Sequence, residues 1–130
     1  MIDLNYVAIA AASIAAFVVS TVYYILFSRP LAELSPAWAE TARPPAWKIA
    51  QEPVRTFVTA SVVAGLITLL GIADWTGGLQ LAFALWLAFP AMLLAGSVIH
   101  ENVPARLAAV HAGDWLLKLL IIGIVVSLWQ

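Results

Sequence analysis

The feature that most constrains this chain is the length of its stretches without charged residues. The first runs from Leu4 to Phe27. A helix rises about 1.5 Å per residue, so this stretch is long enough to cross a hydrocarbon core of about 30 Å. A water-soluble domain usually carries about 25% charged residues, whereas this chain carries 10% and is 64% apolar. We therefore expect lipid, rather than water, to surround most of the chain.

Three further stretches complete the expected topology. Backbone polar groups exposed to lipid must be satisfied within their own segment, which favours helices. The sequence therefore predicts one all-α domain over residues 1–130, an integral membrane four-helix bundle. Its spans are expected at residues 4–27, 56–73, 79–99 and 105–129. The last includes several polar residues, because the uncharged run from Leu119 to Trp129 is too short to cross the membrane alone.

Local signals refine two of these spans. Asn102 can cap the start of the last helix, and Pro104 suits its first turn. Pro90 leaves the Trp86 carbonyl without its usual donor and predicts a kink in the third span.

The longest connection, residues 28–55, is rich in proline and tryptophan. It holds two similar pieces, Pro36-Ala37-Trp38 and Pro45-Ala46-Trp47. Tryptophan is enriched at membrane interfaces. The segment is therefore either a loop held at the headgroups by its tryptophans or a docking surface for a partner or lipid.

Orientation follows from the basic residues. Five of the six lie between spans one and two or at the junction of spans three and four: Arg29, Arg43, Lys48, Arg55 and Arg106. Both connections lie on the same side of a four-span bundle. The positive-inside rule makes that side cytoplasmic and places both termini outside.

Small residues recur every four positions on the first span, at Ala8, Ala12, Ala16 and Ser20. Such a stripe lets another helix backbone approach closely in lipid. The stripe predicts helix packing, either within this chain or against a neighbouring protein.

The last span holds the strongest polar cluster, formed by His111, Asp114 and Lys118. At 100° per residue these three share one helix face, and the acid precedes the base by four residues, which suits an ion pair. Ionisable groups within a membrane are candidates for function. The alternative is structural anchoring, since Lys118 can extend back toward Asp114 and the interface.

Catalysis and metal binding receive no support from motifs. His100 and Glu101 end the third span near the same side as His111, but the spacing matches no ligand motif. No catalytic residue, metal site or cofactor is predicted. Cysteine is absent and the net charge is −1, with no basic stripe for nucleic acid.

Several short pieces together resemble a known family. They are Asn5-Tyr6-Val7-Ala8, Tyr23-Tyr24 with Ile25-Leu26-Phe27, His111-Ala112-Gly113-Asp114-Trp115-Leu116, and Leu128-Trp129. In these the chain resembles the small bacterial membrane proteins called domain of unknown function 1761. The resemblance implies the four-span layout and a bacterial inner-membrane location. It implies no activity.

Three function classes remain open from the sequence. The favoured one is an accessory or structural subunit that packs against a larger membrane complex, because four short helices leave little interior volume. The alternative is a small homo-oligomeric transporter or channel that uses Asp114 and Lys118. A membrane enzyme is the least favoured. The expected partners are the lipid bilayer, other membrane-protein subunits or further copies of the chain.

Overall fold

The structure, a computed structural model, describes residues 3–34 and 46–129, and this part of the chain is helical without strands. The elements are α1 (Tyr6–Leu26), α2 (Ser28–Leu34), α4 (Ala46–Leu70), α5 (Trp75–Trp86), the π-helical turn η1 (Leu87–Ala91), α6 (Met92–Glu101) and α7 (Ala105–Leu128). Within the described residues four helices are long and apolar enough to cross a membrane: α1, α4, the continuous α5–η1–α6, and α7. The fold is an all-α membrane bundle, as predicted.

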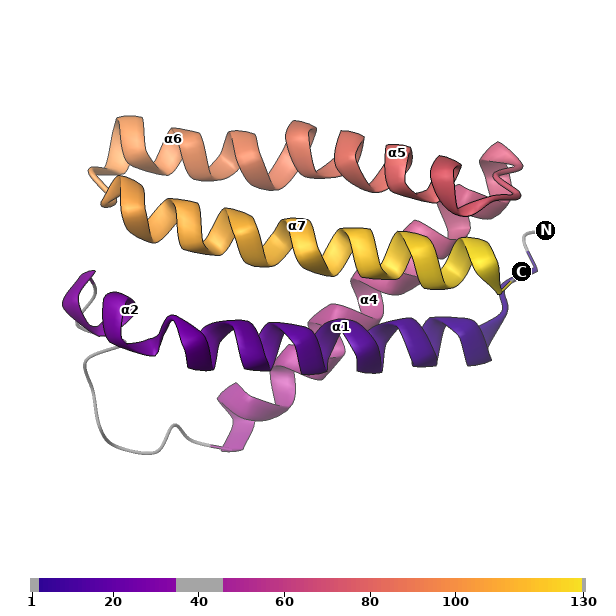
Figure 1. The fold of residues 1–130 in the computed structure, drawn as a ribbon, viewed down its shortest axis with the longest axis horizontal. Coiled ribbons are helices and arrows are strands. Elements are labelled where there is room, and N and C mark those ends of the chain that lie inside the picture. The colour runs from indigo at the N-terminus through magenta and orange to yellow at the C-terminus, as the bar shows by residue number, and fades with distance from the viewer. Residues whose placement is uncertain (1–2, 35–45, 130) are drawn as a thin grey trace.

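Helix α7 is the centre of the bundle. It packs against α1, α4, α5 and α6 (Figure 1), whereas no Cα atoms of α4 and α6 lie within 8 Å of each other in the part that the structure describes. The two ends of the chain meet at one end of the bundle, where the Asn5 side-chain amide donates to the Trp129 carbonyl at 2.7 Å. That proximity agrees with an even number of crossings.

The apolar core occupies the half of the bundle nearest the termini, which we call the packed half. It joins one face each of α1, α4, α5 and α7 through Ile9, Ala12, Ala16, Ala60, Val63, Ala64, Ile67, Ala82, Leu119, Ile122 and Val126. The other half, which we call the polar half, carries Tyr24, Lys48, Glu52, His111 and Asp114. Helix α4 crosses α1 and α7 obliquely (Figure 1).

The second membrane helix begins earlier than the expected span. Helix α4 starts at Ala46 and not at Thr56, so the end of the 28–55 connection is helical, as is α2 near its beginning. Pro53 is accommodated within α4, and the Glu52–Arg55 pair and the Thr56 hydroxyl add local contacts beside it. The expected Pro36-Ala37-Trp38 piece and Arg43 lie outside the described residues.

The second helix also ends before the expected Ala73. Gly71 adopts a positive φ of 67° directly after α4. The Ile72 N–H then bonds to the Ile67 carbonyl and the Gly71 N–H to the Thr68 carbonyl, which is the pairing of a Schellman motif. Asp74 caps α5 by accepting from the Gly77 N–H at 3.0 Å. The turn is therefore defined by two consecutive capping motifs.

The predicted capping role of Asn102 is wrong. Asn102 ends α6 in the left-handed region, with φ of 56°, and its N–H bonds to the Ser97 carbonyl. Asparagine tolerates this conformation better than most residues. Pro104 occupies the N-cap position of α7, where no side chain caps the helix.

Pro90 lies within a π-helical turn. The turn η1 contains it and connects α5 to α6 without a break. A π-helix pairs each carbonyl with the N–H five residues later, which offers the Trp86 carbonyl the N–H of Ala91 in place of the donor that Pro90 lacks. The sequence predicts a kink at Pro90, and the structure shows a π-helical turn at this place within one continuous helix.

Candidate functional site

A buried ion pair lies near the middle of α7. The Lys118 Nζ atom is 3.1 Å from Asp114 Oδ2, and the two residues are only 8% and 2% exposed. The Ser20 hydroxyl of α1 donates to Asp114 Oδ1 at 2.6 Å, and the Trp115 ring lies 5.1 Å from Lys118 Nζ. Ser20, expected only in the packing stripe, therefore also positions the carboxylate.

The third predicted residue, His111, joins the cluster through α1. Its Nδ1 atom is 2.6 Å from the Tyr24 hydroxyl, and Tyr24 also interacts with Asp114. The structure thus brings together His111, Asp114 and Lys118 along one face of α7. His100 and Glu101 do not join them, because both are exposed at the end of α6 and neither lines the pocket described below.

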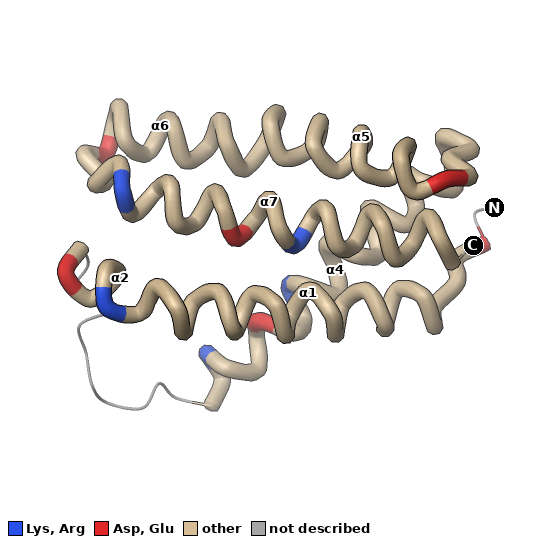
Figure 2. Tube along the Cα trace, viewed as in Figure 1, with Lys and Arg blue, Asp and Glu red and all other residues tan. Residues whose placement is uncertain are grey.

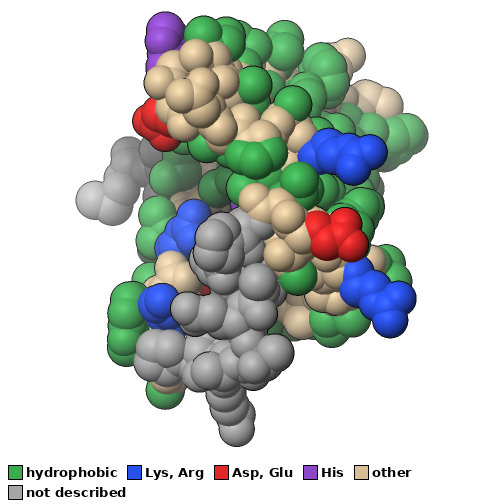
Figure 3. Space-filling model, turned by 90° about the vertical axis from the view of Figure 1, so that its left-hand side faces the viewer, with side chains coloured by type: hydrophobic (Ala, Val, Ile, Leu, Met, Phe, Trp, Pro, Cys, Tyr) green, Lys and Arg blue, Asp and Glu red, His purple; other side chains and the backbone are tan. Residues whose placement is uncertain are grey.

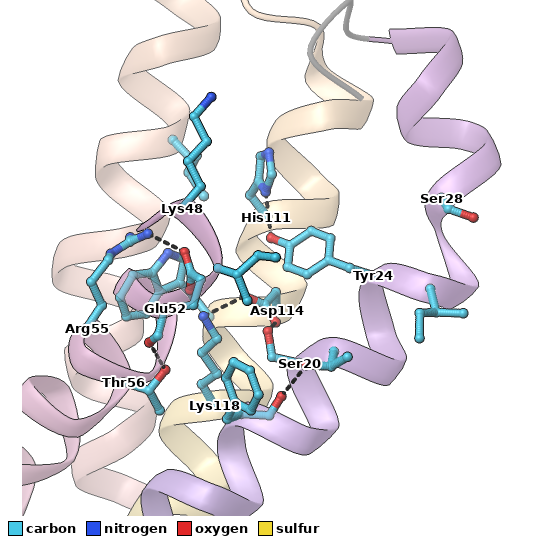
Figure 4. Close-up of a pocket in the computed structure, with 16 residues that line it drawn as sticks. Ser20, Tyr24, Ser28, Lys48, Glu52, Arg55, Thr56, His111, Asp114 and Lys118 are labelled. Atoms are coloured by element: carbon cyan, nitrogen blue, oxygen red, sulfur yellow. Dashed lines mark hydrogen bonds and ion pairs between the residues drawn. The ribbon is translucent and has the colours of Figure 1, made fainter. Parts of the chain in front are cut away.

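Helix α4 supplies three charged residues that the sequence did not assign to this site. Lys48, Glu52 and Arg55 face the same pocket as Asp114 and Lys118 (Figure 4). They recur at positions i, i+4 and i+7, the spacing of one helix face. This spacing could have indicated from the sequence that the three residues share a helix face. It could be used only if the helix was known to begin at Ala46, because the expected span began at Thr56.

These groups surround a cavity of about 760 Å³ between α1, α4 and α7. Figure 4 shows the labelled side chains arranged around it. Its hydroxyl and imidazole groups come from Ser20, Thr21, Tyr24, Ser28, Thr56 and His111. The described charged residues of its lining comprise three cations, Lys48, Arg55 and Lys118, and two carboxylates, Glu52 and Asp114. Figure 2 shows charges of both signs near the middle of α7 and along the first part of α4.

The small-residue stripe of α1 lies inside the bundle. Ala8, Ala12, Ala16 and Ser20 are all buried, and α1 packs against α4 and α7. A second close approach, unassigned from the sequence, joins Gly78 of α5 to Gly123 of α7. A Cβ atom on Gly123 would lie 2.6 Å from the Gly78 carbonyl oxygen. Small residues thus form two helix–helix seams along α7.

Two further interhelical hydrogen bonds, to backbone carbonyls, hold the polar half together. The Tyr23 hydroxyl of α1 donates to the Val110 carbonyl at 2.6 Å. The Trp86 indole of α5 donates to the Ala112 carbonyl at 2.8 Å. Both acceptors belong to α7, so its first half is tied to a neighbour on each side.

A metal-binding cluster is not formed by the residues that the structure describes, where no three His, Asp or Glu side chains gather. The described side chains of the site offer hydrogen bonding and charge pairing.

Comparison with known proteins gives a family and no relative of known activity. The family model described as protein of unknown function (DUF1761) matches residues 7–127. No curated protein and no solved structure matches the chain.

Proposed function

The chain belongs to the family of proteins of unknown function DUF1761, and from its own geometry we propose that it is a membrane-embedded binding protein or small transporter whose site is the pocket around Asp114 and Lys118. The observation that carries this proposal is that the buried ion pair borders a cavity of about 760 Å³. Ligand pockets commonly have volumes of about 300–1,000 Å³.

The cost of the charges supports a role beyond anchoring. Replacing a buried ion pair by apolar residues is often neutral or stabilising, and charged residues at the bilayer centre cost about 2.5–3.5 kcal/mol each on insertion scales. Stability alone gives no reason to keep Asp114 and Lys118, or to turn Glu52 and Arg55 toward them. A polar cavity for a ligand gives such a reason.

An accessory or structural subunit is the second candidate. The sequence favoured it because four short helices leave little interior volume, and the size of the cavity weakens that argument. The stripe at Ala8, Ala12, Ala16 and Ser20 is occupied within the chain, so it offers no surface to a neighbour. For this candidate, the contact offered to another protein is Trp47, which is exposed.

The proposal places the chain in the bacterial inner membrane with the polar half toward the cytoplasm. Lys and Arg side chains are spread over the end of the bundle opposite the termini (Figure 3). Helix α2, which contains Arg29, and the start of α7, which contains Arg106, lie at that end (Figure 1). The positive-inside rule supports this orientation.

Cysteine labelling in the bilayer tests whether the pocket contains water. The natural chain has no cysteine, so single substitutions report cleanly. Thr21 lines the pocket, whereas its neighbour Val22 is half exposed and does not line it. We expect a membrane-impermeant thiol reagent, added from the cytoplasmic side, to label T21C faster than V22C. Equal rates would contradict the proposal.

Purification in mild detergent separates the two candidates. For a binding protein, mass spectrometry of organic extracts should find small molecules on the natural chain that are absent from the variant with both Asp114→Leu and Lys118→Leu. A protein partner that co-purifies in fixed ratio with both forms, together with equal labelling of T21C and V22C, would establish the accessory subunit instead.

A further inference from the structure

A second, apolar cavity lies beside the polar pocket. It measures about 890 Å³ and is lined by α4, by the α5–η1–α6 helix, and by Trp115 and Leu119 of α7. It exists because α4 and α6 both pack on α7, whereas within the described residues no Cα atoms of α4 and α6 lie within 8 Å of each other. Exposed apolar side chains, among them Val62 and Leu93, form its two walls.

The two cavities adjoin each other. Leu94 of α6 and Trp115 of α7 line both, and Trp115 also places its ring beside Lys118. The combined space is polar on the side of Asp114 and apolar on the side of Val62. A molecule that fits both parts has a polar head and a hydrocarbon chain.

The charge of the polar part favours an anionic head group. Its described cations outnumber its carboxylates by three to two. Among the described residues no carboxylate pairs with Lys48, which lies 5.6 Å from the Trp47 ring. The Arg55–Glu52 pair is solvent-accessible, with 56% and 38% of the side chains exposed. Exposed pairs of this kind contribute little, so Arg55 is able to exchange Glu52 for another anion.

We propose that the two cavities together bind one anionic lipid of the surrounding bilayer, with its head group beside Lys48 and Arg55 and a hydrocarbon chain in the groove between α4 and α6. This inference rests on the proposed function and names the ligand class of the same site. Basic pockets between membrane helices on the cytoplasmic side bind anionic head groups in general. The open side between α4 and α6 admits a lipid directly from the bilayer.

Native mass spectrometry of the full chain with added lipid tests the proposal. The probes are phosphatidylglycerol and phosphatidylcholine with identical acyl chains. We expect phosphatidylglycerol to be retained in preference, and K48Q or R55Q to reduce that preference roughly fivefold each, the effect of about one basic residue near an anionic lipid. The matched control is R106Q, since Arg106 is exposed at the start of α7 and lines neither cavity. An equal loss in R106Q would indicate general surface attraction and overturn the proposal.

The groove is tested separately by V62W, which fills it, with V18W as the control. Val18 is 53% exposed, close to the 58% of Val62, but it lies on α1 outside both cavities. V62W should lower retention of both lipids, and V18W should not. If T21C is labelled faster than V22C but neither lipid is preferred, this inference fails and the proposed function stands. If inorganic phosphate protects T21C as well as phosphatidylglycerol does, the ligand is a free anion and the lipid proposal is overturned.

Discussion

The packed half and the polar half of this bundle solve the same problem of holding helices together in lipid by different means. In the packed half, small residues let the backbones approach, as at Gly78 and Gly123. In the polar half, the helices are joined by directed hydrogen bonds, such as those of Ser20 and Tyr23, around a cavity. Lipid provides no hydrophobic drive between helices, so contact area stabilises the first half and individual polar partners stabilise the second.

This difference predicts which substitutions should lower the free energy of unfolding in each half. Adding volume should damage the packed half, which has no room, and should be tolerated where a helix faces open space. Removing one polar partner should damage the polar half, because the group left behind is buried without compensation. The following predictions concern the free energy of unfolding in mixed detergent micelles, measured by titration with a denaturing detergent.

The largest effect is expected from K118L alone. It leaves the Asp114 carboxylate buried without its counter-ion, which typically costs about 3–5 kcal/mol. The double variant with D114L and K118L removes both charges. Its free energy of unfolding should lie within about 1.5 kcal/mol of that of the natural chain, because the remaining cost is the loss of the Ser20 hydrogen bond. If the double variant is as unstable as K118L, the ion pair itself stabilises the polar half, and the argument that stability alone gives no reason to keep Asp114 and Lys118 fails.

The next largest effect is expected from G123A. The added methyl group would meet the Gly78 carbonyl at 2.6 Å and the Ala82 side chain at 3.2 Å, and overpacking of this kind costs about 1–3 kcal/mol. The control is G96A in α6, where nothing lies within 4 Å of the new group. G96A should be neutral or stabilising by up to about 1 kcal/mol. Equal changes in the free energy of unfolding of G123A and G96A would contradict the close packing of α5 and α7 at Gly123.

A smaller effect is expected from Y23F. It removes the hydroxyl that bonds to the Val110 carbonyl, and such a bond contributes about 0.5–1.5 kcal/mol. Y6F is the matched control, because Tyr6 is exposed and its hydroxyl makes no hydrogen bond among the described residues. A loss in Y6F as large as in Y23F would show that the hydrogen bond is not the cause.

The smallest effect concerns the turn outside the membrane and appears as a pH dependence. The Gly77 N–H, and then the Thr76 side chain, hold the pKa of Asp74 below its ordinary value of 3.8. A lowered folded-state pKa gives stability that is present above 3.8 and lost as the pH falls through the folded-state value. D74N keeps the helix cap but does not titrate. Unfolding titrations between neutral pH and pH 3 should therefore show an additional loss in the natural chain, and identical curves would contradict this.

Much of the fold follows from the sequence because the membrane imposes it. Charge-free stretches of spanning length have one stable outcome in lipid, so the four helices and the burial of the stripe from Ala8 to Ser20 follow from local patterns. The ion pair of Asp114 and Lys118 follows from their spacing on one helix. Helix ends were less predictable, as Asn102 shows, because the same residue type suits both an N-cap and a left-handed C-terminal position.

The rest depends on how the helices are placed relative to one another. That Lys48, Glu52 and Arg55 share a pocket with Asp114 results from the oblique path of α4, which no short segment encodes. The gap between α4 and α6 has the same origin. Ser20 is an example. Its spacing in the sequence indicated a packing position, and only the arrangement of α1 beside α7 brings its hydroxyl to the Asp114 carboxylate.

The hydrogen bond from Asn5 to Trp129 has a practical consequence for constructing fusions. Because the chain returns to the side from which it started, fluorescent or enzymatic tags on its two ends must report the same compartment and cannot check each other. An independent reporter of sidedness belongs at the opposite end, for example in α2. By the same logic, two copies joined in tandem by a short linker would insert in parallel, without needing an additional crossing between them.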